Sequence, residues 1–297
     1  MNIKQLFHVS RWDVAYRKIT SETCFDFLAK GQKPIFEPIK DTKEYSFADP
    51  LFYSDEDGDY LFVEAINKKT RKGSLGVFDF NNGLGEYHPI LEEKFHLSYP
   101  LVFKKNGEHF LMPESNNAHE LLLYKAKEYP FKWELFKVLV DGIDCVDTTI
   151  YTAEGDATVY LLSYVKQQPN NKLRIYKLEE DFHVTMIEEI EDKECSLRGA
   201  GNFFSIGDVI YRPSQYCKGL YGQSLIFNRF EHGMPSYKEK PDINIKASDV
   251  IINKYPSYSV TKIHTYSKGG GYEFIDFWHG HFSLLKPIKK LIDKISR

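Results

Sequence analysis

The chain has 297 residues and a formal net charge of −3, and 15% of it is aromatic, with 20 Tyr and 22 Phe. This length allows one large β domain or two smaller ones, the charge gives a nucleic-acid partner no support, and no run approaches the ~20 apolar residues of a membrane span. Because the N-terminus lacks the apolar stretch of a secretion signal and the four cysteines show no CxxC spacing, we expect a cytoplasmic protein with reduced thiols.

The first elements along the chain are two hairpins that repeat one pattern. Each has a Pro near its start and a Glu 14 residues later, and a turn lies midway between them. The second turn is Asn106-Gly107, a strong hairpin signal between β-rich runs because both residues tolerate the positive φ that a tight turn needs. The two hairpins cover residues 49–64 and 99–114.

Three further hairpins follow at 147–163, 199–213 and 260–276, each with a Gly in its turn. Strands of alternating pattern come after several of them. Repeats of ~40–50 residues with several short strands each are typical of propellers. We therefore predict an all-β fold, a five-bladed β-propeller over residues 1–283, with Gln5–Ile19 supplying the missing outer part of the last blade. The expected third and fourth strands are Leu75–Phe80, Leu121–Ala126, Leu173–Leu178, Leu225–Phe230, Trp133–Val140 and Val184–Ile190.

The repeat also predicts where polar side chains meet. In a propeller the first strand of each blade lines the channel, and its start shares one end of the ring with the end of the second strand. We call this end the mouth. Pairing each hairpin symmetrically about its turn places at the mouth Asp49 with Glu64, Tyr99 with Glu114, Asp147 with Ser163, Gly201 with Arg212, and His264 with Asp276, and Arg198, Gln215 and Tyr221 nearby.

Several carboxylates at one cavity are suited to glycoside chemistry. One carboxyl group must stay protonated to donate to a leaving oxygen, while another stays ionised as base or nucleophile. Crowding raises the pKa of some acids by repulsion, and a neighbouring Arg holds others ionised. A structural explanation competes for each single residue, because Asp, His and Arg also cap turns and bond buried strands. No transition-metal spacing occurs among the histidines, so we predict no metal site and no cofactor.

Several motifs together resemble one known family. They are Phe47-Ala48-Asp49-Pro50, His96-Leu97-Ser98-Tyr99-Pro100, Met112-Pro113-Glu114-Ser115, Tyr211-Arg212-Pro213-Ser214-Gln215 with Tyr221-Gly222, and Ile263-His264-Thr265. In this order they are similar to the N-terminal domain of glucosamine inositolphosphorylceramide transferase, over residues 45 to 280. That domain looks like the five-bladed propellers of the arabinanase, invertase and levansucrase glycosidases.

The resemblance implies roles for individual residues. Asp49 matches the Asp of blade one that acts as base or nucleophile, and Asp147 matches the Asp that tunes the pKa of its neighbours. The acidic Glu of a later blade has no clear match, since blade four has Glu194-Cys195-Ser196-Leu197-Arg198-Gly199 there. Glu114 is then the expected proton donor. The remaining mouth residues are expected to contact substrate: Glu64, Tyr99, Arg198, Arg212, Gln215, Tyr221, His264 and Asp276.

The last 14 residues, 284–297, separate apolar side chains from basic ones at helical spacing. A basic amphipathic helix suits an anionic membrane surface, and a helix packed on the ring is the alternative. We expect a carbohydrate-active protein of surface-polysaccharide or glycolipid biosynthesis, acting on a sugar, a sugar nucleotide or a lipid-linked glycan and attached peripherally to the inner membrane face. The rival is a non-catalytic propeller that binds a glycan and presents it to a partner transferase.

Overall fold

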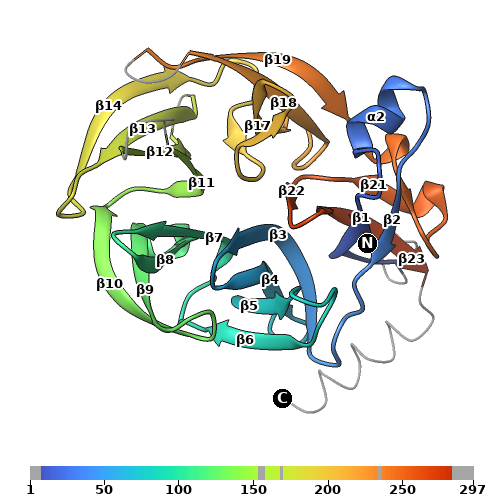
Figure 1. Ribbon diagram of the computed structural model, residues 1–297, viewed down its shortest axis with the longest axis horizontal. Helices are drawn as coiled ribbons and strands as arrows, with labels where there is room; N and C mark the ends of the chain where they lie inside the picture. Colours follow the sequence, from blue (N-terminus) through green and yellow to red (C-terminus); the bar gives the residue numbers. More distant parts are fainter. Residues whose placement is uncertain (1–7, 153–157, 168–169, 233–235, 283–297) are drawn as a thin grey trace.

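Five sheets follow one another around a central axis in the computed structural model, which describes residues 8–152, 158–167, 170–232 and 236–282 (Figure 1). The first three blades are antiparallel sheets of four consecutive strands each. Their strands are β3 (Tyr45–Asp55), β4 (Gly58–Asn67), β5 (Gly73–Asp79) and β6 (Tyr87–Leu91); β7 (Ser98–Lys105), β8 (Glu108–Glu114), β9 (Glu120–Glu128) and β10 (Lys132–Asp141); and β11 (Cys145–Thr152), β12 (Val159–Val165), β13 (Lys172–Leu178) and β14 (Val184–Glu191).

The fourth and fifth blades are less regular, because their inner strands are divided. In the fourth, two short strands pair in turn with the same neighbour, and in the fifth the N-terminal strand joins the sheet. The strands are β15 (Arg198–Gly199), β16 (Phe204–Ile206), β17 (Val209–Tyr216), β18 (Ser224–His232) and β19 (Lys238–Ile245); then β20 (Ile251–Ile252), β21 (Val260–Lys262), β22 (Tyr266–Gly269), β23 (Tyr272–Phe282), β1 (His8–Lys18) and β2 (Ile35–Pro38). The predicted five-bladed propeller is confirmed over the described residues.

The ring is closed by the N-terminal strand, as predicted. Strand β1 pairs with β23 along its whole length, from His8 opposite Phe282 to Lys18 opposite Tyr272. Aromatic packing supports the seam between the last blade and the first, where Phe52 of β3 stacks on Phe274 of β23 with ring centroids 5.2 Å apart. The closure pairs a strand edge that would otherwise be free to associate with another chain.

A short helix lies outside the ring. Helix α2 (Cys24–Ala29) begins at Thr23, which forms a capping box with Asp26, and its Phe25 packs edge-on against Phe227 of β18 at 4.9 Å. Within the described ranges, no helix has the length and apolar character needed to cross a membrane. The amphipathic helix predicted for residues 284–297 lies outside the described residues.

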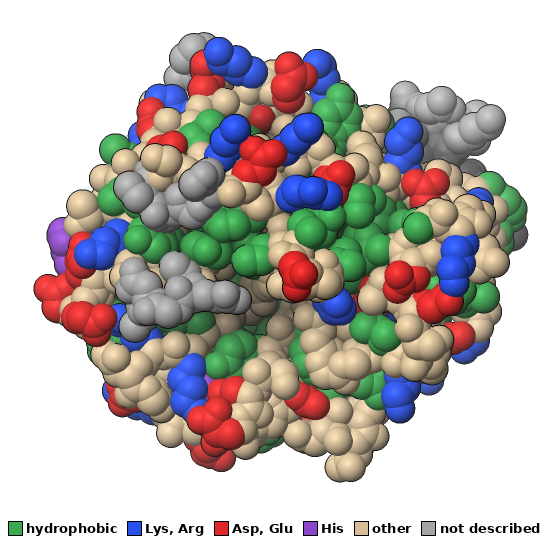
Figure 2. Space-filling view, turned by 45° about the horizontal axis from the view of Figure 1, so that its top comes forward, with side chains coloured by type: hydrophobic (Ala, Val, Ile, Leu, Met, Phe, Trp, Pro, Cys, Tyr) green, Lys and Arg blue, Asp and Glu red, His purple; other side chains and the backbone are tan. Residues whose placement is uncertain are grey.

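The surface carries charges of both signs. On the face that Figure 2 shows, Lys and Arg side chains alternate with Asp and Glu side chains over short distances, and apolar side chains lie between them. This mixture matches the nearly balanced composition of 39 basic and 42 acidic residues.

Candidate active site at the propeller mouth

The first strands of three blades carry the same irregularity at the mouth. Asp49, Tyr99 and Asp147 have φ of 47°, 48° and 45°, although left-handed backbone is uncommon for residues other than Gly. At each of these positions the strand has a β-bulge. Strained backbone held in the same place in three blades points to a site, because bulges re-aim side chains next to functional centres.

The bulges correct the predicted pairing by one residue. Symmetric folding about the turns placed Asp49 opposite Glu64 and Tyr99 opposite Glu114. The structure instead pairs Glu64 with Ala48 and Glu114 with Ser98. The extra residue in the bulge turns Asp49 out of the ladder, and its side chain bonds to neighbouring blades.

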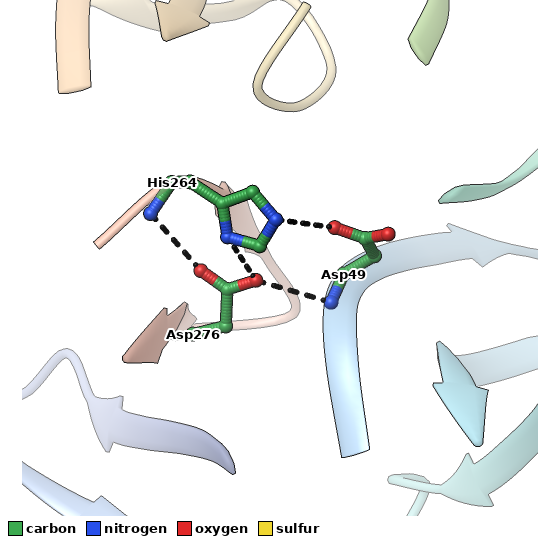
Figure 3. A group of neighbouring side chains, drawn as sticks. All are labelled: Asp49, His264 and Asp276. Atoms are coloured by element: carbon green, nitrogen blue, oxygen red, sulfur yellow. Dashed lines mark hydrogen bonds and ion pairs between the residues drawn. The ribbon is translucent and has the colours of Figure 1, made fainter. Parts of the chain in front are cut away.

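Asp49 meets His264 and Asp276 where the first and last blades adjoin (Figure 3). The carboxylate of Asp49 lies 3.3 Å from Nε2 of His264, and it accepts hydrogen bonds from the Thr265 hydroxyl at 3.0 Å and the Tyr99 N–H at 3.1 Å. All these groups are buried. Asp49 is therefore held by the first, second and fifth blades together.

Asp276 is the anchor of this group. It accepts hydrogen bonds from the backbone N–H groups of His264 (3.1 Å), Thr265 (2.9 Å) and Asp49 (3.2 Å), and its Oδ2 lies 2.7 Å from Nδ1 of His264. The residue has no exposed surface. We conclude that Asp276 orients the imidazole and fixes the bulge of β3.

The pKa values of Asp49 and His264 are both raised, which favours the protonated form of each side chain. Burial raises the pKa of Asp49 to about 7; the nearby His264 opposes this shift, while Glu64, Asp147 and Asp276 add to it. Burial alone would lower the pKa of His264, but Asp276 and Asp49 outweigh burial and raise it. The imidazole thus lies between two carboxyl groups that favour its protonated form.

The same three side chains are one of two sets among the described residues that could hold a metal ion, since one ligand atom from each of Asp49, His264 and Asp276 lies within 4.8 Å of the others. Both oxygens of Asp276 already accept backbone N–H groups. A second set, Asp55, Asp57 and His109, lies at a hairpin tip. At that tip the Lys104 ammonium lies 2.9 Å from Asp57 and already supplies the positive charge that a metal ion would bring. The absence of a metal stays a prediction.

A second acidic pair lies across the mouth. Asp147 of β11 accepts hydrogen bonds from Nε of Arg198 at 2.5 Å and from the Gln215 amide at 2.8 Å. Arg198 also contacts Glu114 at the end of β8, at 3.4 Å. Strands β8, β11, β15 and β17 thus bring these four side chains together from three blades, as the sequence predicted.

Opposite pKa shifts separate the two acids. Burial and the charge of Asp147 raise the pKa of Glu114 well above its usual range, and Arg198 only partly offsets them. Burial alone would raise the pKa of Asp147, but Arg198 and a hydrogen bond with Glu114 lower it. Two carboxyl groups whose pKa values diverge are suited to hold one proton between them as an acid and its partner.

Aromatic rings form the wall between the two acidic groups. The Tyr221 ring lies 4.8 Å from the guanidinium carbon of Arg198 and 5.2 Å from the His264 ring. Trp12 of β1 packs against both rings, with its ring centroid 4.0 Å from that of His264 and 6.2 Å from that of Tyr221. Arg198 and Tyr221 also line a cavity of about 380 Å³ that includes Lys166. The cavity thus offers cations and aromatic faces, and Arg198 connects it to the carboxylates of Asp147 and Glu114.

Glu64 lies at the mouth but has a different partner from the one expected. Its carboxylate is 3.0 Å from Nε2 of His96, whose Nδ1 accepts the Gly73 N–H at 3.0 Å. The hydrogen bond with Glu64 raises the pKa of His96. Since about a third of the His96 side chain is exposed (34%), the pair faces solvent at the rim.

Two predicted substrate contacts are placed elsewhere. Arg212 is completely buried in the fourth blade, where its guanidinium donates to Glu239 at 2.6 and 2.8 Å and to the Tyr237 hydroxyl. It does not face the mouth, because it lies three residues before Gln215 in β17 and its guanidinium reaches outward along the sheet to Glu239 of β19. Tyr99 is also fully buried, and its hydroxyl bonds to Thr149 and Gly201 beneath the mouth. Both therefore serve the fold.

Sequence reasoning missed three residues of the mouth. His96 and Thr265 stand inside the motifs described above but are not among the predicted site residues, and neither is Trp12. Trp12 reaches His264 because β1 pairs with β23, with Trp12 opposite Trp278. The only sequence signal for Trp12 is the predicted pairing of the N-terminal strand with the last blade, which brings this residue to the mouth.

Comparison with known proteins gives the family. A family model described as "Glucosamine inositolphosphorylceramide transferase 1, N-terminal" matches residues 39–255. The chain is 32% identical over 205 residues to glucosamine inositolphosphorylceramide transferase 1 of Oryza sativa subsp. japonica, and 30% identical over 222 residues to that of Arabidopsis thaliana. These matches cover 65% and 70% of this chain, but only 27% of either plant protein, so the chain spans about a quarter of their length.

Solved structures share the fold at low sequence identity. The alpha-L-arabinofuranosidase of Podospora anserina is 11% identical with a TM-score of 0.57, over 82% of this chain and 94% of that one. The exo-beta-1,3-galactanase of Phanerochaete chrysosporium is 11% identical with a TM-score of 0.56, over 91% of this chain and 63% of that one. The family model covers most of the propeller, and the chain therefore belongs to the glucosamine inositolphosphorylceramide transferase 1 N-terminal family.

Proposed function

We propose that the mouth is a carbohydrate-active site that serves glycosyl transfer or glycosidase-like chemistry in glycolipid or surface-polysaccharide biosynthesis. The observation that carries the proposal is the pair Glu114 and Asp147, two carboxyl groups in contact whose pKa values shift in opposite directions. The names of the plant relatives, which are glycolipid transferases, support the same context. The substrate would be a sugar, a sugar nucleotide or a lipid-linked glycan.

In this proposal each mouth residue has a separate chemical role. Protonated Glu114 gives its proton to the leaving oxygen, and Asp147 with Arg198 holds that proton in place until it is needed. Asp49 acts as base or nucleophile. His264, held by Asp276, controls when Asp49 is ionised.

The site has room for more than one sugar. The cavity beside Arg198 and Tyr221 adjoins a second one of about 560 Å³ between the second and third blades, since Lys166 and Gln167 line both. Trp12 and Tyr221 offer aromatic faces on which a pyranose ring packs well. We propose that Gln215 and Tyr221 belong to the substrate-contacting surface and that Glu64 and His96 form its opposite rim.

A binding function without turnover is the second candidate, and one observation favours it. The Asp49 carboxylate is 7% exposed and already accepts hydrogen bonds from Thr265 and Tyr99. A base so fully bonded must exchange a partner before it can reach a substrate. A propeller that only presents a glycan to a partner transferase would leave these bonds intact.

Asp49→Asn and Glu114→Gln decide between the two. The full chain would be incubated with a panel of sugar nucleotides and oligosaccharides, with product followed by mass spectrometry and binding by calorimetry. An enzyme should lose about 10²–10⁴-fold in turnover in each variant with little change in binding. The exposed Asp208→Asn is the matched control. Binding without turnover in the wild type would contradict catalysis and leave the presenting function.

We further propose that the protein is cytoplasmic and attaches to the inner membrane face through residues 284–297. The support is the segregation of apolar and basic side chains in that segment. Flotation with anionic liposomes should recover the full chain, and deletion of 284–297 should release it. Recovery that survives the deletion would refute this attachment.

A further inference from the structure

Another cavity lies at the seam where the ring closes, and none of the site residues discussed above lines it. It has a volume of about 540 Å³ and is bounded by β1, by the segment between β2 and β3, and by the residue that follows β4. We call it the seam cavity. Its charged lining residues are four cations, Arg11, Lys40, Lys68 and Lys254, and two acids, Asp13 and Asp41.

The seam cavity opens at the same end of the propeller as the mouth. Strand β4 runs from its hairpin tip through Glu64 at the mouth, and Lys68 follows its last residue. Strand β23 likewise passes Asp276 before it reaches His279, which pairs with Arg11 of β1. The cavity is therefore on the rim of that end, between the fifth and first blades.

The two acids of the seam cavity are occupied by two of its cations. Arg11 lies 2.9 Å from Asp13 and 2.9 Å from Asp41, and Lys68 lies 2.9 Å from Asp41. Asp13 is held further by His279 at 2.7 Å and is buried. These contacts form a fixed wall in which the charges of two cations and two carboxylates balance.

The other two cations are not balanced in this way. Lys40 and Lys254 are exposed at the opening, and no carboxylate of the described residues lies within 4 Å of either ammonium group. Four cations against two carboxylates leave a formal charge of +2 in a chain whose net charge is −3. Lys254 is placed by a left-handed backbone (φ 67°), and its N–H donates to the Asn253 side chain at 3.0 Å.

Apolar surface lies beside this charge. Ile39, Pro38 and the ring of Tyr255 line the same cavity. The Tyr255 hydroxyl donates to Asp13 at 3.3 Å, so the ring has a fixed orientation. If an anionic group binds at the lysines, the rest of the ligand can therefore pack against this apolar surface.

We propose that the seam cavity binds a phosphate group, carried by a phosphorylated small molecule or by a lipid headgroup. A phosphate offers several acceptor oxygens and up to two negative charges, which match two ammonium donors and the excess charge of +2. Lys40 and Lys254 bind the phosphate, and Arg11 and Lys68 add positive potential from the wall. This site is independent of the chemistry proposed for the mouth.

The test compares two double variants of the full chain that remove the same charge. Lys40→Gln with Lys254→Gln removes the proposed ligands, and Lys33→Gln with Lys94→Gln removes two exposed lysines elsewhere. The probes are inorganic phosphate, glucose 6-phosphate, and phosphatidylcholine vesicles with or without phosphatidylinositol, measured by calorimetry and by vesicle sedimentation.

The first variant should lose at least about tenfold in affinity while the control stays near the wild type, because two charge-assisted contacts are removed. Thermal melting should be unchanged in both, since these lysines are exposed. Binding of the soluble probes alone identifies a small-molecule site, and binding of the phosphatidylinositol vesicles alone identifies a lipid headgroup. Equal binding by both variants, or no binding of any probe at millimolar concentration by the wild type, overturns the proposal.

Discussion

Asp276→Asn should destabilise the propeller strongly, although the two side chains have nearly the same shape. Asp276 accepts three backbone N–H groups and lies beside Nδ1 of His264, without any exposed surface. Asn keeps one acceptor oxygen. If that oxygen retains the N–H groups of His264 and Thr265, the new NH₂ group points at the N–H of Asp49 and the protonated Nδ1 of His264.

The size of the effect follows from these contacts. Hydrogen bonds to a charged group contribute about 1.5–3 kcal/mol each, so the loss of two predicts a fall of roughly 3–6 kcal/mol in the free energy of unfolding. For a chain of this size, each kcal/mol corresponds to about 2–4 °C in Tm. Urea denaturation and thermal melting followed by circular dichroism would measure both quantities.

A spectroscopic readout separates this explanation from general damage. The charge of Asp276 raises the pKa of His264. Asp276→Asn should therefore lower it, which titration of the imidazole signals by NMR would detect. The exposed Asp208→Asn should change neither stability nor this pKa. A loss below about 1 kcal/mol would refute the assignment of Asp276 as the buried anchor.

Three further outcomes are expected. If the mouth is catalytic, its rate should rise with pH as Asp49 ionises, with a midpoint of about 7, and fall at higher pH as Glu114 loses its proton; a rate that does not depend on pH between 5 and 9 would contradict both roles. Tyr99→Phe should cost about 1–3 kcal/mol in urea denaturation, because it leaves the buried N–H of Gly201 without a partner, and a neutral effect would contradict this. Arg212→Leu should cost about 3–5 kcal/mol because it leaves a buried acid without its cation, with retained stability as the contrary result.

The regular part of the fold could be predicted because it is repeated. Alternating side chains and Gly-containing turns identify each hairpin locally, so the blades followed from short windows of sequence. The outer strand β19 was missed because its Lys238–Ile245 segment is mostly polar, as suits a strand that packs on one side only. Strand β6 was missed because it has only five residues and contains Pro89, which weakens a strand pattern.

The site could be predicted only where it depends on the repeat. Asp49, Glu114 and Asp147 follow from the hairpin ends, but the one-residue offset of the bulges has no signal in the residue types. The prediction for Arg212 was wrong because the residue pattern of β17 does not show that its guanidinium turns outward along the sheet to Glu239. Partners such as His96 for Glu64 depend on side-chain directions across blades, which single-strand patterns do not contain.

The pairing of β1 with β23 has a consequence for the order in which the protein is made. Within the described propeller, β1 must wait for β23, since their paired residues are separated by more than 250 positions, from Lys18 with Tyr272 to His8 with Phe282. Contacts this distant in sequence form slowly, because loop closure must come first. Asp49 emerges with the first blade and His264 and Asp276 only with the fifth, so a chain that stops before the fifth blade cannot assemble this group. The site therefore appears only after the last blade of the propeller has been synthesised.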